Sequence, residues 1–343
     1  MTYTLDEKIG QMIMVGFKGA TLTTGIRKKI STRQIGGVWL TDSASPMGDI
    51  PGNIKNRDQV KNLIRDLQKF ADIPLFVSID AEGGQVIRLK EKFGFPPIPS
   101  ARELGRRNDP KQTYDAALKI SSLLRSLGIN INFAPVVDME IAPDNPAICG
   151  KDRCFSSHPE EVYQHARQFI LAHRANNIYT CLKHFPGHGS TREDTHLTLA
   201  DATESFQEKE LFPYRKLIKE GLADTVLIAH ILVKTLDEEF PASLSSKIIE
   251  QLLINELNFK GLVISDDLIM GAIRQHYSDE KAVELTLRAG TDILMNSAAD
   301  QPQSLGCEPT FEIIKKLVTD NIISEARINR SFNKIIKFKR GIS

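Results

Sequence analysis

The stretch Tyr179-Thr180-Cys181-Leu182-Lys183-His184-Phe185-Pro186-Gly187-His188-Gly189 joins a short apolar run to a dense group of ionisable side chains. The apolar run, residues 179–182, predicts a buried strand. Pro186 and the two glycines prevent the residues after it from forming a continuous helix. We therefore predict that the polar residues leave the end of a strand on a loop, where a rigid scaffold usually presents catalytic groups.

Other short runs of apolar and β-branched residues recur along the chain, separated by stretches long enough for a helix. Several of those stretches place apolar residues on one helical face and charged residues on the opposite face. The predicted strands are Gln11–Val15, Gly37–Leu40, Pro74–Asp80, Ile131–Asp138, Tyr179–His184, Thr225–His230, Leu262–Asp266 and Asp292–Met295. The predicted helices include Asp58–Ala71, Tyr114–Leu127, Pro159–Ala175 and Ile248–Leu257.

Eight strands alternating with helices over 343 residues predict a closed (β/α)8 barrel, the TIM-like α/β fold, with residues 1–343 as a single domain. An open doubly wound sheet is the alternative, but it usually carries a G-x-G-x-x-G turn after its first strand. The segment Val15-Gly16-Phe17-Lys18-Gly19 lacks that pattern. A barrel also gathers strand ends on one face, and polar residues end many of the predicted strands: Asp80, Asp138, Lys183, His184, His230, Asp266 and Asp267.

The composition is ordinary for a globular protein, with 41% hydrophobic residues, 25% charged residues and a formal net charge of +1. So small a net charge gives no reason to expect nucleic acid or an anionic membrane as a partner. No apolar run approaches the roughly 20 residues that span a bilayer. The first eight residues also lack the basic start and apolar core of a signal peptide. We therefore predict a cytoplasmic protein, unless a native leader has been removed, and the sequence leaves the oligomeric state open.

Four cysteines do not make a disulfide framework in a chain of this length. Cys149 and Cys154 stand five positions apart, which permits a small-loop disulfide. Because the cytoplasm keeps thiols reduced, we predict two free thiols at these positions.

Asp266 and Asp267 end an apolar strand, where adjacent carboxylates are out of place unless they are used or paired. Strand alternation sends their side chains to opposite sides, so one of them is predicted to face the mouth of the barrel. A carboxylate there is able to act as a nucleophile, a general base or a metal ligand. The other suits the N-cap of a helix that we expect to begin near Leu268.

Asp194 and His196 are separated by one residue, so both side chains point the same way if the segment is locally extended. An aspartate that binds an imidazole fixes its tautomer and favours its protonated form. Such a histidine is a competent proton donor near neutral pH. The alternative is a surface pair on a loop with no catalytic role.

Asp80, Lys183 and His184 are predicted to bind the hydroxyl groups of a ligand. Lys183 and His184 end one strand and are able to donate hydrogen bonds, and Lys183 also balances a nearby aspartate. Asp80 ends another strand, shortly before paired glycines that allow a sharp turn at the rim of the pocket. There it is able to accept two hydroxyl groups of a sugar. For Glu82 we expect only a salt bridge to Arg88.

A metal site is not predicted. His184 and His188 have the separation of two zinc ligands on one face of a helix, but Pro186 and Gly187 exclude a helix there. The H-E-x-x-H pattern, paired C-x-x-C motifs and the phosphate-binding G-x-x-x-x-G-K-[ST] loop are all absent from the sequence. We therefore expect neither a metal nor another cofactor.

Taken in order, these segments closely resemble glycoside hydrolase family 3, and within it the single-domain NagZ-like β-N-acetylglucosaminidases. The resemblance implies a TIM-like barrel, in agreement with the strand count. Many members of the family add an α/β sandwich domain that supplies a glutamic acid as acid/base, and we expect no room for one before Ser343. The matching segments are Leu5–Met12, Asp80–Arg88, Asn132–Asp138, Arg153–Ser156, Lys183–Gly189, Asp194–His196, Pro241–Ser245 and Ser265–Met270.

Carried over position by position, the resemblance implies roles for individual side chains. Asp266 would be the nucleophile, and Asp267 would be the structural acid of the pair. His196, oriented by Asp194, would be the acid/base in place of the missing glutamic acid. The residues implied to bind the sugar in the −1 subsite are Asp80, Arg153, Lys183 and His184. This chain has Cys154 after the arginine, where the family commonly has a small residue.

The implied reaction is hydrolysis of a terminal β-linked N-acetylglucosamine with retention at the anomeric carbon. Asp266 attacks to form a glycosyl-enzyme while His196 protonates the departing oxygen, and His196 then deprotonates water. A neutral base repels an incoming anion less than a carboxylate does, so phosphorolysis is a variant of the reaction. The implied partner is a small amino-sugar glycoside, either a muropeptide of peptidoglycan recycling or a chitooligosaccharide fragment.

Two other classes of function stay open from the sequence. A metal-dependent barrel hydrolase would lose its activity to a chelator and regain it with zinc. A non-catalytic amino-sugar-binding protein would bind N-acetylglucosamine without releasing it from a glycoside.

Overall fold

Eight short parallel strands form the centre of the molecule: β1 (Ile13–Gly16), β2 (Gly37–Leu40), β3 (Phe76–Ile79), β6 (Ile131–Asn132), β7 (Tyr179–Phe185), β9 (Thr225–Ile228), β11 (Leu262–Ser265) and β12 (Leu294–Asn296). The computed structural model describes residues 2–43, 52–195, 197–297 and 306–342. The strands make one sheet in the order β11-β9-β7-β6-β3-β2-β1-β12, and a parallel bridge between Ile264 and Ile293 joins its two ends. The sheet thus closes on itself, which confirms the predicted TIM-like barrel over the open sheet.

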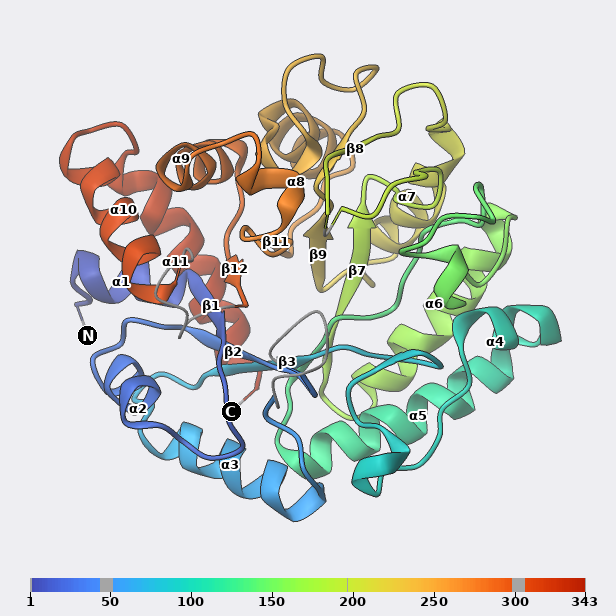
Figure 1. The fold of residues 1–343 in the computed structure, drawn as a ribbon, viewed down its shortest axis with the longest axis horizontal. Helices are drawn as coiled ribbons and strands as arrows, with labels where there is room; N and C mark the ends of the chain where they lie inside the picture. Colours follow the sequence, from blue (N-terminus) through green and yellow to red (C-terminus); the bar gives the residue numbers. More distant parts are fainter. Residues whose placement is uncertain (1, 44–51, 196, 298–305, 343) are drawn as a thin grey trace.

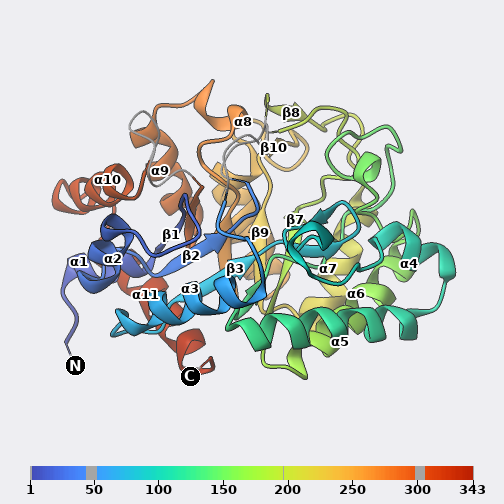
Figure 2. The ribbon, with the colours of Figure 1, turned by 60° about the horizontal axis from the view of Figure 1, so that its bottom comes forward.

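Helices lie around the outside of this barrel, as Figure 1 and Figure 2 show. Within the described ranges, none of them has both the length and the apolar content that crossing a membrane requires. The longer helical segments are α1 (Leu5–Gln11), α2 (Thr24–Ser31), α3 (Arg57–Lys69), α4 (Ala101–Arg107), α5 (Pro110–Leu127), α6 (Pro159–Arg174), α7 (Phe212–Lys219), the π-helical η5 (Lys247–Glu256), α9 (Asp279–Ala289), α10 (Cys307–Thr319) and α11 (Glu325–Arg340).

Each predicted strand is present, although most are shorter than expected. The run predicted as Ile131–Asp138 keeps only residues 131–132 in β6, because Pro135 has no amide hydrogen to donate to a neighbouring strand. The first strand begins at Ile13 because α1 continues to Gln11. Every residue of β1, β3, β9 and β11 is buried, since side chains fill the barrel inside and helices cover it outside.

Two small additions at the ends of the strands were not predicted. β4 (Ala81–Gly83) pairs antiparallel with β5 (Val86–Ile87) directly after β3. β8 (Ala200–Asp201) pairs parallel with β10 (Ile231–Leu232), which places the chain after β7 beside the chain after β9. Both pairs follow the carboxyl ends of barrel strands, so they build the rim of the barrel on that side.

Helix α4 packs against the chain that follows Arg153. A Cβ atom placed on Gly105 of α4 would lie 1.7 Å from the carbonyl oxygen of Phe155. Only a residue without a side chain allows this close approach, so Gly105 fixes the distance between α4 and the segment after Arg153. Gly25 of α2 is the opposite case, because no atom lies within 4 Å of the corresponding Cβ position.

A buried acid supports the loop after β7. Glu210 lies in a short helical turn, η3 (Glu208–Leu211), and its side chain accepts a hydrogen bond from the amide of Gln207 at 3.1 Å. The other carboxyl oxygen lies 2.9 Å from the position of a Cβ on Gly187, and within the described chain it has no hydrogen-bond partner. Burial raises the pKa of Glu210 to about 7, so the folded protein favours the neutral carboxyl group.

We predict that Gly105→Ala lowers the free energy of unfolding by roughly 2 kcal/mol or more, because the added methyl group overlaps the Phe155 carbonyl. Gly25→Ala, the matched helical control, should raise the free energy of unfolding by up to about 1 kcal/mol through its higher helix propensity. Urea denaturation of both variants measures the two effects. Equal effects of the two substitutions would contradict the close approach of α4.

We predict that Glu210→Gln stabilises the protein at pH 8 by up to about 3 kcal/mol, because glutamine cannot ionise in the buried site. Since the pKa is raised in the folded state, wild-type stability is complete below the unfolded pKa of 4.5 and is lost as the pH rises toward about 7. The gain from the variant should therefore shrink as the pH falls to 5. Urea denaturation at pH 5 to 8 measures it, with the exposed Glu208→Gln as control. A gain that is the same at every pH would contradict this assignment.

Candidate active site

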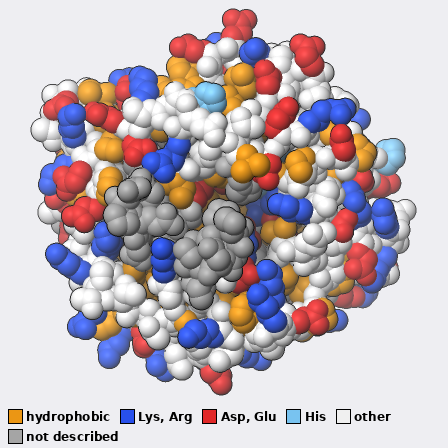
Figure 3. All heavy atoms as spheres, viewed as in Figure 1, with side chains coloured by type: hydrophobic (Ala, Val, Ile, Leu, Met, Phe, Trp, Pro, Cys, Tyr) orange, Lys and Arg blue, Asp and Glu red, His pale blue; other side chains and the backbone are white. Residues whose placement is uncertain are grey.

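The carboxyl ends of the barrel strands meet on one face of the molecule. Figure 3 shows that face hollowed near its middle, with acidic and basic side chains visible in and around the hollow. The predicted site residues Asp80 and Asp266 directly follow β3 and β11, and Lys183 and His184 lie among the last three residues of β7. The barrel closure thus brings to one place residues that are far apart in the sequence.

Lys183 lies at the centre of the site and binds two acids. Its ammonium group is 2.8 Å from Oδ1 of Asp80 and 2.6 Å from Oε1 of Glu82, and its side chain is 3% exposed. Asp80 also accepts hydrogen bonds from Trp39 at 3.1 Å and from Arg88 at 3.3 Å. Asp80 and Lys183 are therefore held by buried or half-buried partners on several sides.

Arg153 completes a group of four charges, which we call the charge cluster: Asp80, Glu82, Arg153 and Lys183. Its guanidinium donates two hydrogen bonds of 2.8 Å to the two carboxyl oxygens of Glu82, the bidentate geometry that favours arginine over lysine. It also donates to the carbonyl oxygen of Ala147 at 2.8 Å. The cluster therefore holds two positive and two negative charges in direct contact.

The charges of the cluster stabilise each other against burial. Burial by itself raises the pKa of Asp80 and Glu82, but the charges of Lys183, Arg88 and Arg153 outweigh it and hold both pKa values below their usual range. Burial likewise lowers the pKa of Lys183, and the two carboxylates more than compensate, so this pKa is raised. All four side chains are therefore charged at neutral pH.

His184 is a neutral imidazole with one defined tautomer. Its Nε2 lies 3.2 Å from a guanidinium nitrogen of Arg153. Because a guanidinium group only donates hydrogen bonds, Nε2 is the acceptor in this one. Its Nδ1 then carries the hydrogen and donates to Asp138 at 2.6 Å. Burial, with the nearby charges of Arg153 and Lys183, lowers the pKa of His184 well below its usual value.

Asp138 is a site residue to which the sequence analysis assigned no role. It is 1% exposed, and besides the His184 ring it accepts hydrogen bonds from the amides of His184 and His188. One carboxylate thus fixes both the imidazole and the backbone of the loop that follows. The sequence indicates that Asp138 is polar and follows a predicted strand, but it gives no sign that the partner is His184, 46 residues away.

The expected salt bridge between Glu82 and Arg88 is wrong. Arg88 instead pairs with Asp80 at 3.3 Å and with Asp42 at 3.5 Å, whereas Glu82 pairs with Arg153 and Lys183. The reason is local. Asp80 and Glu82 stand two apart in extended chain, so both side chains point into the barrel mouth toward Lys183.

The two acids after β11 have different contacts. Oδ1 of Asp266 accepts the amide of Asp267 at 2.8 Å, and the negative charge of Asp266 acts on the imidazole of His184. The carboxylate of Asp267 accepts the amides of Ile269 at 3.3 Å and Ser297 at 3.1 Å. Asp267 therefore holds the turn after β11, but the predicted N-cap role is wrong, because the helix α8 (Gly271–Arg274) begins three residues later than expected and its N-cap is Met270.

The segment that carries Asp194 is tied to both neighbouring loops. Nε2 of His188 is 3.2 Å from the hydroxyl of Thr195, and the carbonyl of Thr195 accepts the amide of Ala272 at 3.3 Å. Asp194 is half-buried, and His196, the predicted acid/base, lies outside the described residues. The anchors at Thr195 place the Asp194 segment between the loop after β7 and the loop that follows Asp266.

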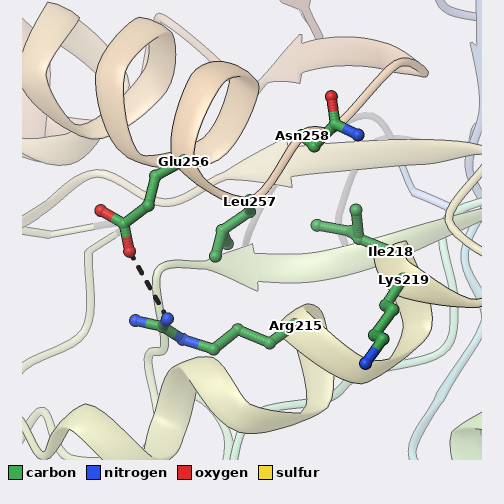
Figure 4. A pocket seen from close by; sticks show the side chains of 6 residues that line it. All are labelled: Arg215, Ile218, Lys219, Glu256, Leu257 and Asn258. Atoms are coloured by element: carbon green, nitrogen blue, oxygen red, sulfur yellow. Dashed lines mark ion pairs between the residues drawn. The ribbon is translucent and has the colours of Figure 1, made fainter.

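A hollow elsewhere on the surface has no part in this site. It measures about 370 Å³ and lies between α7 and the end of η5, where Arg215 and Glu256 pair across it at 3.4 Å (Figure 4). Three or more potential metal-binding side chains do not gather anywhere in the described parts of the chain. The rings of His184 and His188, which have the sequence separation of two zinc ligands, are hydrogen-bonded to Asp138 and to Thr191.

Nearly the whole chain matches a family of known proteins. Residues 4–338 match the family described as "Glycosyl hydrolase family 3 N terminal domain". A protein of Xylella fastidiosa (strain M23) named "Beta-hexosaminidase" is 34% identical over 293 residues, which cover 83% of this chain and 82% of that protein.

Solved structures of similar proteins extend the match to the fold. A glycoside hydrolase family 3 β-N-acetylglucosaminidase from Paenibacillus sp. str. FPU-7 has a TM-score of 0.90 and 32% identity, covering 99% of this chain and 63% of that longer one. A β-N-acetylhexosaminidase from Beutenbergia cavernae DSM 12333 has a TM-score of 0.88 and 27% identity, covering 99% of both chains. The match to the family model and to these relatives shows that the chain belongs to glycoside hydrolase family 3.

Proposed function

We propose that this glycoside hydrolase is a retaining exo-β-N-acetylglucosaminidase that acts on small amino-sugar glycosides such as muropeptides or chitooligosaccharide fragments. The observation that carries the proposal is the charge cluster at the barrel mouth, with His184 beside it. The names of the similar proteins, β-hexosaminidase and β-N-acetylglucosaminidase, support the choice of sugar. As part of the proposal, residues 1–343 act as one barrel domain in the cytoplasm.

Sugar binding is assigned to Asp80, Arg153, Lys183 and His184. Lys183 has three N–H groups and binds two carboxylates in the described chain, which leaves one N–H for a sugar hydroxyl. Asp80 supplies carboxylate oxygens that accept hydroxyl groups. Because each of these side chains already has fixed partners, the sugar meets a site that needs little rearrangement.

The bond-breaking step is assigned to Asp266 and His196. Asp266 attacks the anomeric carbon and forms a glycosyl-enzyme, while His196, oriented by Asp194, gives its proton to the leaving oxygen. His196 then takes a proton from water, which attacks the same carbon and releases the sugar with retained configuration. The anchoring of Thr195 to Ala272, six residues after Asp266, supports the approach of the two groups.

Phosphate is a second acceptor in the proposal. When the base is a neutral imidazole and not a carboxylate, the site carries one negative charge fewer, and an incoming anion is repelled less. Arg153 and Lys183 are paired with carboxylates, so the cluster adds no net charge against an anion. Assays with and without phosphate separate release of free sugar from formation of a sugar phosphate.

Substrate choice is the first test of the proposed function. We expect kcat/KM for nitrophenyl β-N-acetylglucosaminide to exceed that for the β-glucoside by at least about 100-fold, because a site built for the acetamido group leaves polar groups unpaired with glucose. Activity should need no added metal and should survive a chelator. A preference for the glucoside would overturn the amino-sugar assignment but not the family.

The nucleophile is tested by substitution and by labelling. Asp266→Ala should lower kcat by on the order of 10⁴-fold or more, as loss of a covalent nucleophile does in other hydrolases. Asp267→Asn is the matched neighbour and should retain far more activity. A 5-fluoro glycosyl inhibitor should label Asp266, as peptide mass spectrometry would show. Labelling at Asp267, with an active Asp266→Ala enzyme, would refute the assignment.

The acid/base role of His196 predicts a dependence on the leaving group. His196→Ala should lose at least about 100-fold more activity on a disaccharide than on a dinitrophenyl glycoside, because dinitrophenolate departs without a proton. Asp194→Ala should show a smaller loss of the same kind, since the imidazole remains but is less well held. Azide should accelerate His196→Ala on the activated substrate. Equal losses on both substrates, with no azide effect, would exclude this role.

A further inference from the structure

Two buried cysteines stand on either side of the segment that carries Arg153. Cys149 is the first residue of the short helical turn η2 (Cys149–Lys151), and Cys154 directly follows Arg153. Both are free thiols with 0% exposure, and their sulfur atoms lie 2.7 Å apart. The predicted free thiols are thus present, but in contact with each other.

The backbone holds this pair in place through its own hydrogen bonds. The amide of Asp152 donates to the carbonyl of Cys149 at 3.1 Å, and the amide of Gly150 donates to Asn145 at 2.7 Å. A disulfide needs its sulfurs at about 2.05 Å, so the two atoms have to approach by only about 0.7 Å. Bond formation is therefore compatible with the turn as it stands.

The surroundings of the two sulfurs are apolar. Cys149 and Cys154 pack with Val136, Ala147 and Ile148 in a small cluster of their own. What distinguishes the pair is its place in the chain, because a bond between the sulfurs would enclose Arg153 in a ring of six residues.

We propose that Cys149 and Cys154 are a site of disulfide formation, oxidised by a low-molecular-weight disulfide such as oxidised glutathione, and that the bond holds Arg153 against Glu82 and His184. One thiolate attacks oxidised glutathione and releases one reduced glutathione. The second thiolate then attacks the mixed disulfide and releases another. Two S–H bonds are lost and one S–S bond forms, while both electrons and both protons end on the two glutathione molecules.

The exchange is slow, because neither sulfur is exposed and the turn has to open before glutathione reaches it. The contact with Cys149, together with burial, raises the pKa of the Cys154 thiol well above its usual range, so thiolate is scarce. The pair therefore follows the redox poise of its compartment over hours and does not respond to brief changes. Formation of the bond does not depend on the proposed sugar chemistry.

The test uses the full wild-type protein, incubated under native conditions in glutathione buffers of increasing oxidised fraction. After denaturation and alkylation, intact mass and peptide mapping count the thiols that remain and locate any disulfide, with no substrate involved. We expect a 149–154 disulfide, a higher Tm, and cleavage by trypsin after Lys151 slowed about tenfold or more, because the ring restricts opening of the turn. On a glycoside substrate, kcat/KM should change by less than about twofold.

Two double variants separate this pair from the other cysteines. Cys181→Ala/Cys307→Ala keeps only the pair and should respond as the wild type does. Cys149→Ala/Cys154→Ala should show no change of Tm between the buffers. The proposal is overturned if the wild-type protein keeps four alkylatable thiols in every buffer, or if mapping places the disulfide elsewhere. It is also overturned if the bond forms but leaves the Tm and the trypsin rate unchanged.

Discussion

The charge cluster is the constraint on which the site depends. Asp80, Glu82, Arg153 and Lys183 are nearly excluded from water, and each would be unstable alone in such surroundings. Their charges sum to zero, and every one has a partner within 2.8 Å. Breaking one pair of this kind leaves an uncompensated buried charge, which costs about 3–5 kcal/mol. The cluster therefore fixes three segments relative to one another, namely the chain after β3, the segment after η2 and the end of β7, because removing one member leaves its partners unpaired.

Hydrogen bonds also link the cluster to the segment that carries Asp194. Arg153 fixes the His184 tautomer, and the ring of His184 binds Asp138. Asp138 in turn holds the amide of His188, whose ring reaches Thr195 beside Asp194. One continuous path of hydrogen bonds thus runs from the sugar-binding residues to the loop proposed to carry the acid/base. Each link in this path limits how far its neighbours are free to move.

The barrel was predictable from the sequence, because its evidence is local. Each strand is a short apolar run whose residues need only to be buried. Strands such as Phe76–Ile79 and Leu262–Ser265 are therefore recognisable from their own sequence, without information about the strands beside them. The pairing within the site was not predictable in the same way. Glu82 and Arg153 are 71 residues apart, and the nearer Arg88 was the natural but wrong partner. The spacing of Asp80 and Glu82 was the signal available, since residues two apart in extended chain share a side.

The site thus combines two kinds of support that differ in stiffness. The sugar-binding residues are locked by short charge-assisted bonds at the ends of β3 and β7, where the barrel itself is rigid. The Asp194 segment is held at Thr195, which is buried, while Arg192, Glu193 and Leu197 around it are exposed. A stiff sugar pocket beside a more exposed loop suits the proposed chemistry, because the sugar has to stay fixed through two steps. The acid/base serves a different oxygen in each step, first that of the leaving group and then that of the water.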